Sequence, residues 1–294
     1  MPNSQSSSPL DDIIVGFASG YDWRQLRNYA ISLSRCGFVG RRVLFLHDVS
    51  EEARINLTNL RFDLFDFDPG DEHVTVYRWK ILSEWLEYEV ENGSARNVVT
   101  CDVSDVIFQL DPGAWLQMFQ KKPLVAADEF VPFVGEQCNN RWITGLYGED
   151  AVKMLAPEHI VCSGTIAGSP VELAAIAADI YGDVHRAGFG KEYGYDQGAL
   201  NYLLRTKYKD KFQLPNLGEG FIITPGFYLA GVEALDNEGK QIVLREDMIC
   251  EMRDGVVCVK NEKWAYCIVH QFNRSKFWYD IMEWRYTPFP SELL

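Results

Sequence analysis

The stretch Val98-Val99-Thr100-Cys101-Asp102-Val103-Ser104-Asp105-Val106-Ile107-Phe108 decides how the rest of this chain is interpreted. Its opening residues are apolar and β-branched, which is typical of a strand buried in a parallel sheet. Asp102 and Asp105 follow at the point where such a strand ends. Because α/β proteins bind ligands in the crevice outside the carboxyl ends of their strands, the stretch predicts two carboxylates at a binding crevice.

Two carboxylates at this position suit a divalent metal ion. Mg²⁺ and Mn²⁺ prefer oxygen ligands, often two carboxylates together with the phosphate oxygens of a bound substrate. Aspartate is also a common turn residue, so a polar turn without any ligand is the alternative interpretation. The rest of the chain has to distinguish between the two.

Composition predicts one folded α/β domain with a short tail. The chain has 294 residues, of which 47% are hydrophobic and 13% aromatic, enough for a large packed core. We find no internal repeat and no linker, so residues 11–294 are expected to form a single domain. Residues 1–10 are polar and Ser-rich, without the basic and apolar regions of a signal peptide, and are expected to form a flexible tail.

Charge and cysteine usage exclude several classes of function. The formal net charge is −14 and no basic patch is visible, which argues against nucleic acid and anionic membrane as main partners. No apolar run is long enough for a transmembrane segment. The seven cysteines are irregularly spaced and include no C-x-x-C, so neither a zinc site nor a disulfide framework is indicated. A reducing, cytoplasmic location fits this pattern.

The first half of the chain alternates strands with helices. Apolar runs predict strands at 13–17 and 42–47, and helical spacing predicts a helix from Trp23 to Gly37 between them. A third strand at 62–67 alternates apolar and charged residues, so it should lie near an edge, and a helix is expected at 74–90. Strand, helix, strand in this order indicates a right-handed βαβ unit and a mainly parallel sheet flanked by helices.

The second half is less regular. A strand at 124–127, another at 160–168 and helices beginning at Ser169 and Asp196 are expected. Residues 130–157 are Gly-rich and aromatic without a clear period, which predicts a long functional or mobile loop. Short strands at 241–244, 256–259 and 267–269 predict a smaller mixed β region near the C-terminus, followed by an aromatic, basic tail at 271–286.

Four separated segments resemble the GT-A type of nucleotide-sugar glycosyltransferase, a Rossmann-like fold, and in particular the retaining family that includes glycogenin and bacterial lipopolysaccharide galactosyltransferases. The first is Asp102-Val103-Ser104-Asp105, which resembles the family's Asp-x-Asp metal motif with one additional residue. Asp105 aligns with the second aspartate of that motif. Asp102 replaces the first only if the backbone bulges between them.

The second segment is His270-Gln271-Phe272-Asn273-Arg274-Ser275-Lys276-Phe277-Trp278, which has the family's His, Lys and Trp at the same spacing. The resemblance implies that His270 is the third metal ligand and that Lys276 contacts the diphosphate. Neutral imidazole suits Mn²⁺, and lysine is a common phosphate contact. A single histidine after an apolar strand is more often structural, but its occurrence together with Lys276 and Trp278 favours the ligand.

The third and fourth segments flank the donor sugar in the family. Cys162-Ser163-Gly164 stands where the family has an Asn-Ser-Gly or Asn-Ala-Gly turn, and Cys162 lacks the amide of the usual asparagine. Asp196-Gln197-Gly198-Ala199-Leu200-Asn201 is close to the family's Asp-Gln-x-x-Leu-Asn. The resemblance makes Ser163 and Gly164 donor-binding residues, and Asp196 and Gln197 catalytic ones. Asp196 could equally be a helix N-cap.

Weaker matches extend the donor site. Arg78 lies in the helix before the metal strand, where the family's arginine approaches the nucleotide, and Ala18 and Tyr21 lie in the first loop, where the base stacks. Without the resemblance, Arg78 is a solvated helix residue and Tyr21 an ordinary loop aromatic. Asp128-Glu129 ends a strand and is a weaker candidate for binding donor or acceptor.

The resemblance implies a glycosyltransferase that uses Mn²⁺ or Mg²⁺. It would move a sugar from a nucleoside-diphosphate sugar, with UDP favoured, to a hydroxyl of a glycan or other acceptor, with retention of configuration. Two alternatives keep the same site: a nucleotide-sugar hydrolase, and a catalytically silent binding relative, which the Asp102-x-x-Asp105 spacing and Cys162 favour. A nucleotidyltransferase is disfavoured because no Gly-rich basic loop precedes the first helix.

Overall fold

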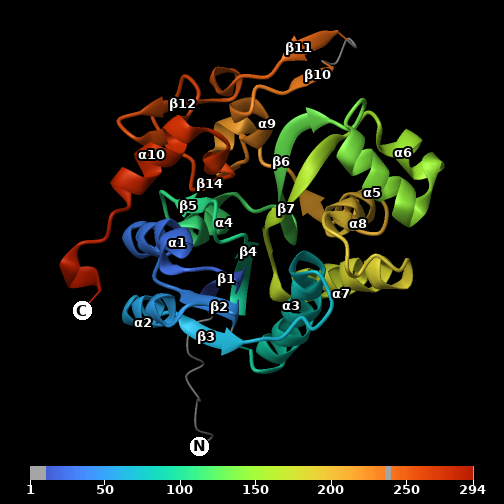
Figure 1. Cartoon of the computed structure of the whole chain (residues 1–294). Coiled ribbons are helices and arrows are strands. Elements are labelled where there is room, and N and C mark those ends of the chain that lie inside the picture. The colour runs from blue at the N-terminus through green and yellow to red at the C-terminus, as the bar shows by residue number, and fades with distance from the viewer. Residues whose placement is uncertain (1–10, 94, 236–239, 294) are drawn as a thin grey trace, which may run out of the picture.

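The computed structural model describes residues 11–93, 95–235 and 240–293, so the predicted tail at 1–10 lies outside the described residues. Figure 1 shows the arrangement of its elements. The strands are β1 Asp11–Ser19, β2 Arg41–His47, β3 Asp63–Asp66, β4 Ala95–Cys101, β5 Val106–Phe108, β6 Leu124–Pro132, β7 His159–Gly168, β8 Phe212–Gln213, β9 Ile222–Ile223, β10 Glu233–Leu235, β11 Gln241–Val243, β12 Cys250–Arg253, β13 Val256–Val259 and β14 Ile268–His270. The α-helices are α1 Trp23–Arg35, α2 Glu51–Asn59, α3 Val74–Glu91, α4 Pro112–Phe119, α5 Gln137–Tyr147, α6 Glu149–Leu155, α7 Pro170–Arg186, α8 Tyr195–Arg205, α9 Gly226–Leu229 and α10 Lys276–Arg285.

A seven-stranded sheet in the order β3-β2-β1-β4-β7-β6-β8 forms the centre. The pairs among β3, β2, β1 and β4 are parallel, β7 is antiparallel to both of its neighbours, and β8 is parallel to β6. The prediction of a mainly parallel sheet flanked by helices is confirmed. The short strand β3 is the outermost strand on its side, as its alternating sequence predicted.

Both faces of this sheet are covered by helices (Figure 1). In β1, Ile14 and Ala18 belong to one core cluster with α1 and α2, whereas Ile13 and Val15 belong to a second cluster with α3 and α7. Successive side chains of a strand point to opposite faces, so a strand buried on both faces needs a continuous apolar run. This is why the apolar runs of the first half predicted their strands correctly.

The stretch from Val98 to Phe108 is divided between two sheets. Strand β4 ends at Cys101, and β5 begins at Val106 in a separate sheet of order β5-β14-β9. In that sheet β14 pairs antiparallel with β5 and parallel with β9. The carboxyl end of β4 therefore meets the C-terminal part of the chain, and the expected smaller β region near the C-terminus is present.

The prediction of a long irregular loop at 130–157 is wrong. Strand β6 continues to Pro132, and helices α5 and α6 occupy most of the remainder. Glu136 caps α5 by accepting hydrogen bonds from the backbone N–H groups of Cys138 and Asn139. Gly148, at φ +84°, ends α5 and stands at the N-cap of α6. Helix α5 packs against α8, and this tertiary contact stabilises a segment with weak local periodicity.

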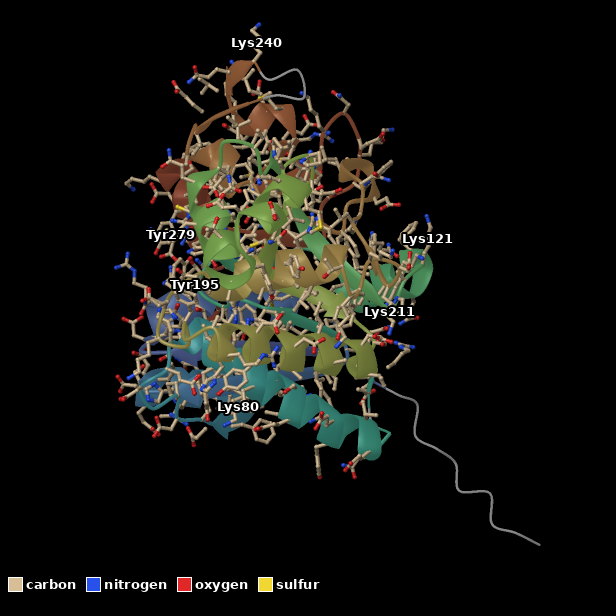
Figure 2. All side chains as sticks on the ribbon, turned by 90° about the vertical axis from the view of Figure 1, so that its right-hand side faces the viewer. Lys80, Lys121, Tyr195, Lys211, Lys240 and Tyr279 are labelled. Atoms are coloured by element: carbon tan, nitrogen blue, oxygen red, sulfur yellow. The ribbon has the colours of Figure 1, made fainter. Side chains whose placement is uncertain are left out.

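Other departures are smaller. Helix α2 was not predicted, although Ser50 caps it and Glu51 and Glu52 lie in its first turn, a recognisable start signal. The predicted tail at 271–286 contains α10. Side chains such as Lys121 and Lys211 lie at the surface (Figure 2). Among the residues that the structure describes, no helix is long and apolar enough to cross a membrane.

Candidate active site

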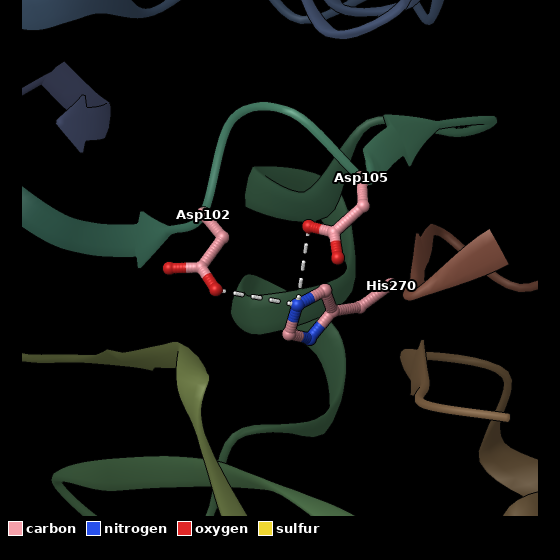
Figure 3. Close-up of side chains that lie close together, drawn as sticks. All are labelled: Asp102, Asp105 and His270. Atoms are coloured by element: carbon pink, nitrogen blue, oxygen red, sulfur yellow. Dashed lines mark ion pairs between the residues drawn. The ribbon is translucent and has the colours of Figure 1, made fainter. Parts of the chain in front are cut away.

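Three residues from two sheets meet at the carboxyl end of β4. Asp102 follows β4, Asp105 precedes β5, and His270 is the last residue of β14, opposite Val106 in the antiparallel pair. His270 Nε2 lies 3.5 Å from Asp102 Oδ2 and 3.5 Å from Asp105 Oδ1 (Figure 3). The structure thus brings together the three side chains that the sequence assigned to one metal site.

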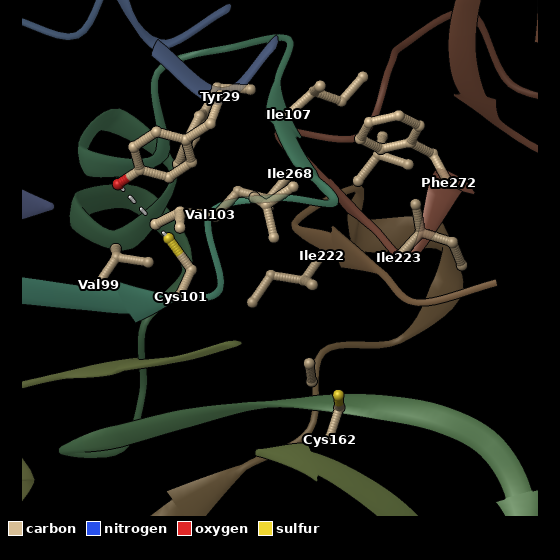
Figure 4. Close-up of a cluster of buried hydrophobic side chains, with 14 of the residues drawn as sticks. Tyr29, Val99, Cys101, Val103, Ile107, Cys162, Ile222, Ile223, Ile268 and Phe272 are labelled. Carbon is tan, nitrogen blue, oxygen red and sulfur yellow. Dashed lines mark hydrogen bonds between the residues drawn. The ribbon is translucent and has the colours of Figure 1, made fainter. Parts of the chain in front are cut away.

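Val103 explains how the longer Asp102-x-x-Asp105 spacing is accommodated. Its side chain is 2% exposed and belongs to the core that contains Cys101 and Tyr29 (Figure 4). It packs against Gly16 of β1, where an added Cβ would lie only 2.4 Å from Val103 Cγ1. The chain leaves the strand after Cys101 and buries the additional side chain, so that both carboxylates reach His270. The longer spacing required the backbone to leave the regular strand between the two aspartates, and it does so.

Hydrogen bonds orient the imidazole of His270. The Thr165 hydroxyl donates to the Gly164 carbonyl at 2.7 Å, which leaves its oxygen to accept from His270 Nδ1 at 3.5 Å. Cys162 Sγ lies 3.6 Å from the same nitrogen. With its proton on Nδ1, a neutral His270 would direct the Nε2 lone pair to a cation bound between the two carboxylates, as in a metal-binding histidine.

The triad fits a divalent cation. Within the described part of the chain, His270 Nε2 and Asp105 Oδ1 are buried and have no hydrogen-bond partner. Atoms 3.5 Å apart can both bind one ion, since two bonds of about 2.1 Å span up to about 4 Å. Gly164 keeps the space open, because a Cβ there would lie 2.3 Å from His270 Cε1 and 2.6 Å from Asp102 Oδ2. Two carboxylates and one imidazole are an appropriate ligand set for Mn²⁺ or Mg²⁺.

Without a bound metal ion, opposite charges hold the triad together. Burial opposes charge on His270, but Cys162 and the two carboxylates raise the pKa of the imidazole well above its ordinary value. Burial likewise opposes charge on Asp102, but Arg78 and His270 hold the pKa of its carboxyl far below the usual range. Asp102 is therefore a carboxylate at all ordinary pH values, ready to bind a cation.

Arg78 connects the triad to the third and fourth segments of the resemblance, at Ser163 and Asp196. From α3 its guanidinium contacts Asp102, donates to Asp196 Oδ2 at 3.0 Å and donates to the Ser163 carbonyl at 3.2 Å. Burial alone would lower the pKa of Arg78, but the two carboxylates outweigh burial and raise it. The interpretation of Arg78 as a solvated helix residue is wrong, because only 12% of its side chain is exposed.

Asp196 and Gln197 are held firmly at the start of α8. Asp196 is 1% exposed, and its Oδ2 also accepts from Trp79 Nε1 at 3.1 Å. The N-cap of α8 is Gly194, so Asp196 lies within the helix and is not its cap. Gln197 accepts from the Ser163 backbone N–H at 3.1 Å and donates to Asn139 Oδ1 at 3.0 Å. These contacts join α8, β7 and α5.

Three further residues were predicted to bind the donor: Ala18, Tyr21 and Lys276. Ala18 is buried near the carboxyl end of β1, and the Tyr21 carbonyl accepts from the Ser50 N–H at 3.3 Å in the next loop. Lys276 begins α10 with 85% of its side chain exposed, and its ammonium lies 2.6 Å from Asp280. None of the described contacts joins Lys276 to the triad, and its role on a diphosphate stays a prediction.

A cavity of about 280 Å³ adjoins Gln197 and contains residues that sequence reasoning missed or ranked low. Glu129 lines it and is 2% exposed, whereas its neighbour Asp128 interacts with His159 at 3.1 Å instead. Trp142 of α5 lines the same cavity. Two acidic residues after an apolar strand were a signal for Glu129, but nothing in the sequence pattern distinguishes Trp142 from other aromatic residues.

Comparisons with known proteins place this site on a known fold. No protein-family model matches the chain, and neither does any curated protein. Among solved structures, the galactosyltransferase LgtC in complex with donor and acceptor sugar analogs matches with a TM-score of 0.55 at 16% identity, covering 96% of this chain and 98% of LgtC. This chain has an LgtC-like fold. An active-site glutamine-to-glutamate variant of LgtC matches with a TM-score of 0.52 at 14% identity, covering 88% and 86% of the two chains.

Proposed function

We propose that the protein is a metal-dependent glycosyltransferase that moves a sugar from a nucleoside-diphosphate sugar, UDP-sugar favoured, to a hydroxyl of a glycan or other acceptor. The observation that carries the proposal is the triad of Asp102, Asp105 and His270, in which two ligand atoms are buried without a hydrogen-bond partner among the described residues. The LgtC-like fold supports it, because LgtC is a galactosyltransferase that was solved with donor and acceptor analogs.

Each donor-binding residue has a defined place in this proposal. Mn²⁺ or Mg²⁺ held by the triad would bind the diphosphate and neutralise the charge that develops on the leaving nucleoside diphosphate. Ala18 and Tyr21 would contact the base, and Ser163 and Gly164 the donor sugar. Lys276 would exchange Asp280 for the diphosphate, which its high exposure permits.

Asp196 and Gln197 are the proposed catalytic residues. The transferred sugar develops positive charge at its anomeric carbon, which a fixed carboxylate stabilises. Arg78 and Trp79 both bind Asp196 Oδ2, so the carboxyl group is held in one orientation. Gln197, fixed between Ser163 and Asn139, would orient the sugar with its amide. We propose retention of configuration, as in the family that the sequence resembles.

Two alternatives use the same residues. A nucleotide-sugar hydrolase would transfer the sugar to water, and a silent relative would bind the nucleotide sugar without turnover. The buried Arg78–Asp196 pair supports catalysis, because it fixes a carboxylate that can stabilise positive charge in the transition state. A cytoplasmic location is proposed from the seven free cysteines.

The test is thermal stability against nucleoside diphosphates and nucleotide sugars, with and without Mn²⁺. A ligand that binds the folded state raises its melting temperature. We expect one nucleotide to raise it only with metal, and the shift to disappear in Asp105→Ala and His270→Ala but not in the surface control Asp210→Ala. Turnover of donor without acceptor would assign a hydrolase, and binding without turnover a silent relative. No shift with any nucleotide and metal would overturn the proposal.

A further inference from the structure

A cavity of about 670 Å³ lies at the opposite end of β5 and β14 from the metal triad. Leu110, which follows β5, and Cys267, which precedes β14, both line it, whereas His270 is the last residue of β14. No member of the triad lines this cavity. Small-molecule sites typically measure about 300–1,000 Å³, so the cavity has the size of a ligand site and is separate from the proposed donor site.

Apolar side chains gather at this cavity although they are exposed to solvent. Its lining includes four large apolar side chains that are between 41% and 69% exposed: Leu110, Met118, Phe119 and Trp264. Single exposed apolar residues are ordinary, but a group of them around one hollow marks a binding site. The cavity therefore offers an apolar and largely aromatic wall to a ligand.

Two tryptophan rings at the cavity are fixed by successive carbonyl groups of one turn. Trp264 Nε1 donates to the Gly218 carbonyl at 3.1 Å, and Trp115 Nε1 donates to the Glu219 carbonyl at 2.8 Å. Gly220, at φ +68°, continues the turn and lets the ring approach, since an added Cβ there would lie 3.0 Å from Trp264 Cδ1. Both indole N–H groups are thus bonded within the protein, and the rings present carbon surface to the cavity.

The charged side chains of the cavity are both acidic. Asp111 and Glu219 line it. Asp111 accepts from the Gly113 backbone N–H and Glu219 from the Asn216 backbone N–H, each at 2.9 Å, and neither carboxylate forms a salt bridge with a basic side chain of the described residues. Because the indole N–H groups are occupied, the lining side chains offer no free nitrogen donor to an anion. The cavity therefore favours a cation, in a protein whose formal net charge is −14.

The aromatic wall narrows the kind of cation. A cation over the face of an aromatic ring is attracted to it, most strongly with tryptophan, and aromatic sites of this kind recognise quaternary ammonium ions. A primary ammonium carries three N–H donors and a guanidinium five, which all need acceptors. The lining side chains supply oxygen acceptors only at Asp111 and Glu219, and both already accept a backbone hydrogen bond. An ion without N–H groups therefore fits this cavity best.

The geometry points to a binding site for a quaternary ammonium ion that carries an apolar group. The exposed surface of Trp264 would contact the cationic head, and Asp111 and Glu219 would balance its charge. Met118 and Phe119 would contact the apolar group. Occupation of this cavity needs neither metal nor nucleotide, so the inference goes beyond the proposed function and does not depend on it.

The experiment observes the Trp264 indole in the full chain labelled with ¹⁵N-tryptophan. Its N–H resonance is identified by its absence from Trp264→Leu, which replaces an exposed side chain. Four probes share one benzyl group: benzyltrimethylammonium, protonated benzylamine, benzyl alcohol and phenylmethanesulfonate. We expect benzyltrimethylammonium to shift the resonance in a saturable manner, and the amine and the alcohol to bind about tenfold more weakly. Phenylmethanesulfonate should not shift it.

A double variant that removes charge but keeps the hydrogen bonds tests the two carboxylates. In Asp111→Asn with Glu219→Gln, the amide oxygens can still accept from the backbone N–H groups. We expect benzyltrimethylammonium to bind this variant about tenfold more weakly, and benzyl alcohol to bind it as before. The matched control, Glu84→Gln with Glu87→Gln, removes the same charge from the exposed face of α3 and should change neither affinity.

Three results would overturn the inference. They are no shift with benzyltrimethylammonium, equal affinity for the cation and the alcohol, and equal weakening in the two double variants. Affinity should also be the same with and without UDP and Mg²⁺, since competition would place the probe in the nucleotide site instead. If the cation binds as expected and no nucleotide binds, the inference stands and the proposed function falls. If a nucleotide binds with metal and the cation does not bind, the reverse holds.

Discussion

Arg78 donates a hydrogen bond of 3.0 Å to Asp196, from the helix that precedes the metal-site strand to the helix that carries the proposed catalytic carboxylate. The side chain of Asp196 is only 2% exposed, so its charge depends on this partner. Removing one member of a buried ion pair costs about 3–5 kcal/mol, because the other charge stays buried without compensation. We expect Arg78→Met to lower the free energy of unfolding by about that amount, as measured by urea denaturation.

Arg186 is the matched control for this prediction. It pairs with Asp183 three residues earlier in α7, but 73% of its side chain is exposed. Exposed ion pairs contribute about 0–1 kcal/mol, so Arg186→Met should be close to neutral. Equal effects of the two substitutions would show that Asp196 does not depend on Arg78.

Gly164 provides a test of the metal site that leaves every ligand in place. In Gly164→Ala the new Cβ would lie 2.3 Å from His270 Cε1 and 2.9 Å from Nε2, so the imidazole must move. We expect at least a tenfold loss of Mn²⁺ affinity by calorimetry and a loss of roughly 1–3 kcal/mol in stability from overpacking. Gly218→Ala, where an added Cβ meets nothing within 4 Å, should change neither quantity.

Gly16 and Val103 should behave as a coupled pair. An alanine at Gly16 would place its Cβ 2.4 Å from Val103 Cγ1, so Gly16→Ala should destabilise by about 1–3 kcal/mol. Shortening the neighbour as well, in Gly16→Ala with Val103→Ala, should recover at least about 1 kcal/mol of the sum of the single effects. Additive effects in urea denaturation would show that Val103 does not pack on Gly16 as described.

The parallel half of the sheet was predictable because its strands are buried on both faces. A continuous apolar run such as 43–46 is typical of such a strand, and the helices between the strands have ordinary caps and apolar spacing. The metal triad was predictable from the chemistry of Asp102, Asp105 and His270 and from the resemblance of their segments to a family. The three residues meet because β14 pairs with β5, and paired residues such as Ile268 and Phe108 are 160 positions apart in the chain.

The rest depended on tertiary contacts that leave little local signal. Helix α5 lacks a clear apolar period because it packs on α8 through Trp142, whose space comes from Gly194 and Gly198 in another segment. Arg78 resembled a surface residue because its partners are about 24 and 118 positions away along the chain. Glu129 differs from Asp128 only in which side chain reaches the cavity, and sequence alone does not decide that.

Glu129 should make stability depend on pH in a predictable direction. Burial raises its pKa from 4.5 to about 7, so the folded protein holds a proton that the unfolded chain releases at lower pH. The stabilisation from this proton is fully present below about pH 4.5 and is lost as pH rises through about 7. Since one pKa unit is about 1.4 kcal/mol, the buried charge costs up to about 3 kcal/mol at pH 8. Glu129→Gln should therefore gain stability over the wild type at pH 8 but little at pH 4.5, in urea denaturation at both pH values. Parallel pH profiles for the two proteins would contradict a buried carboxyl group with a raised pKa at this position.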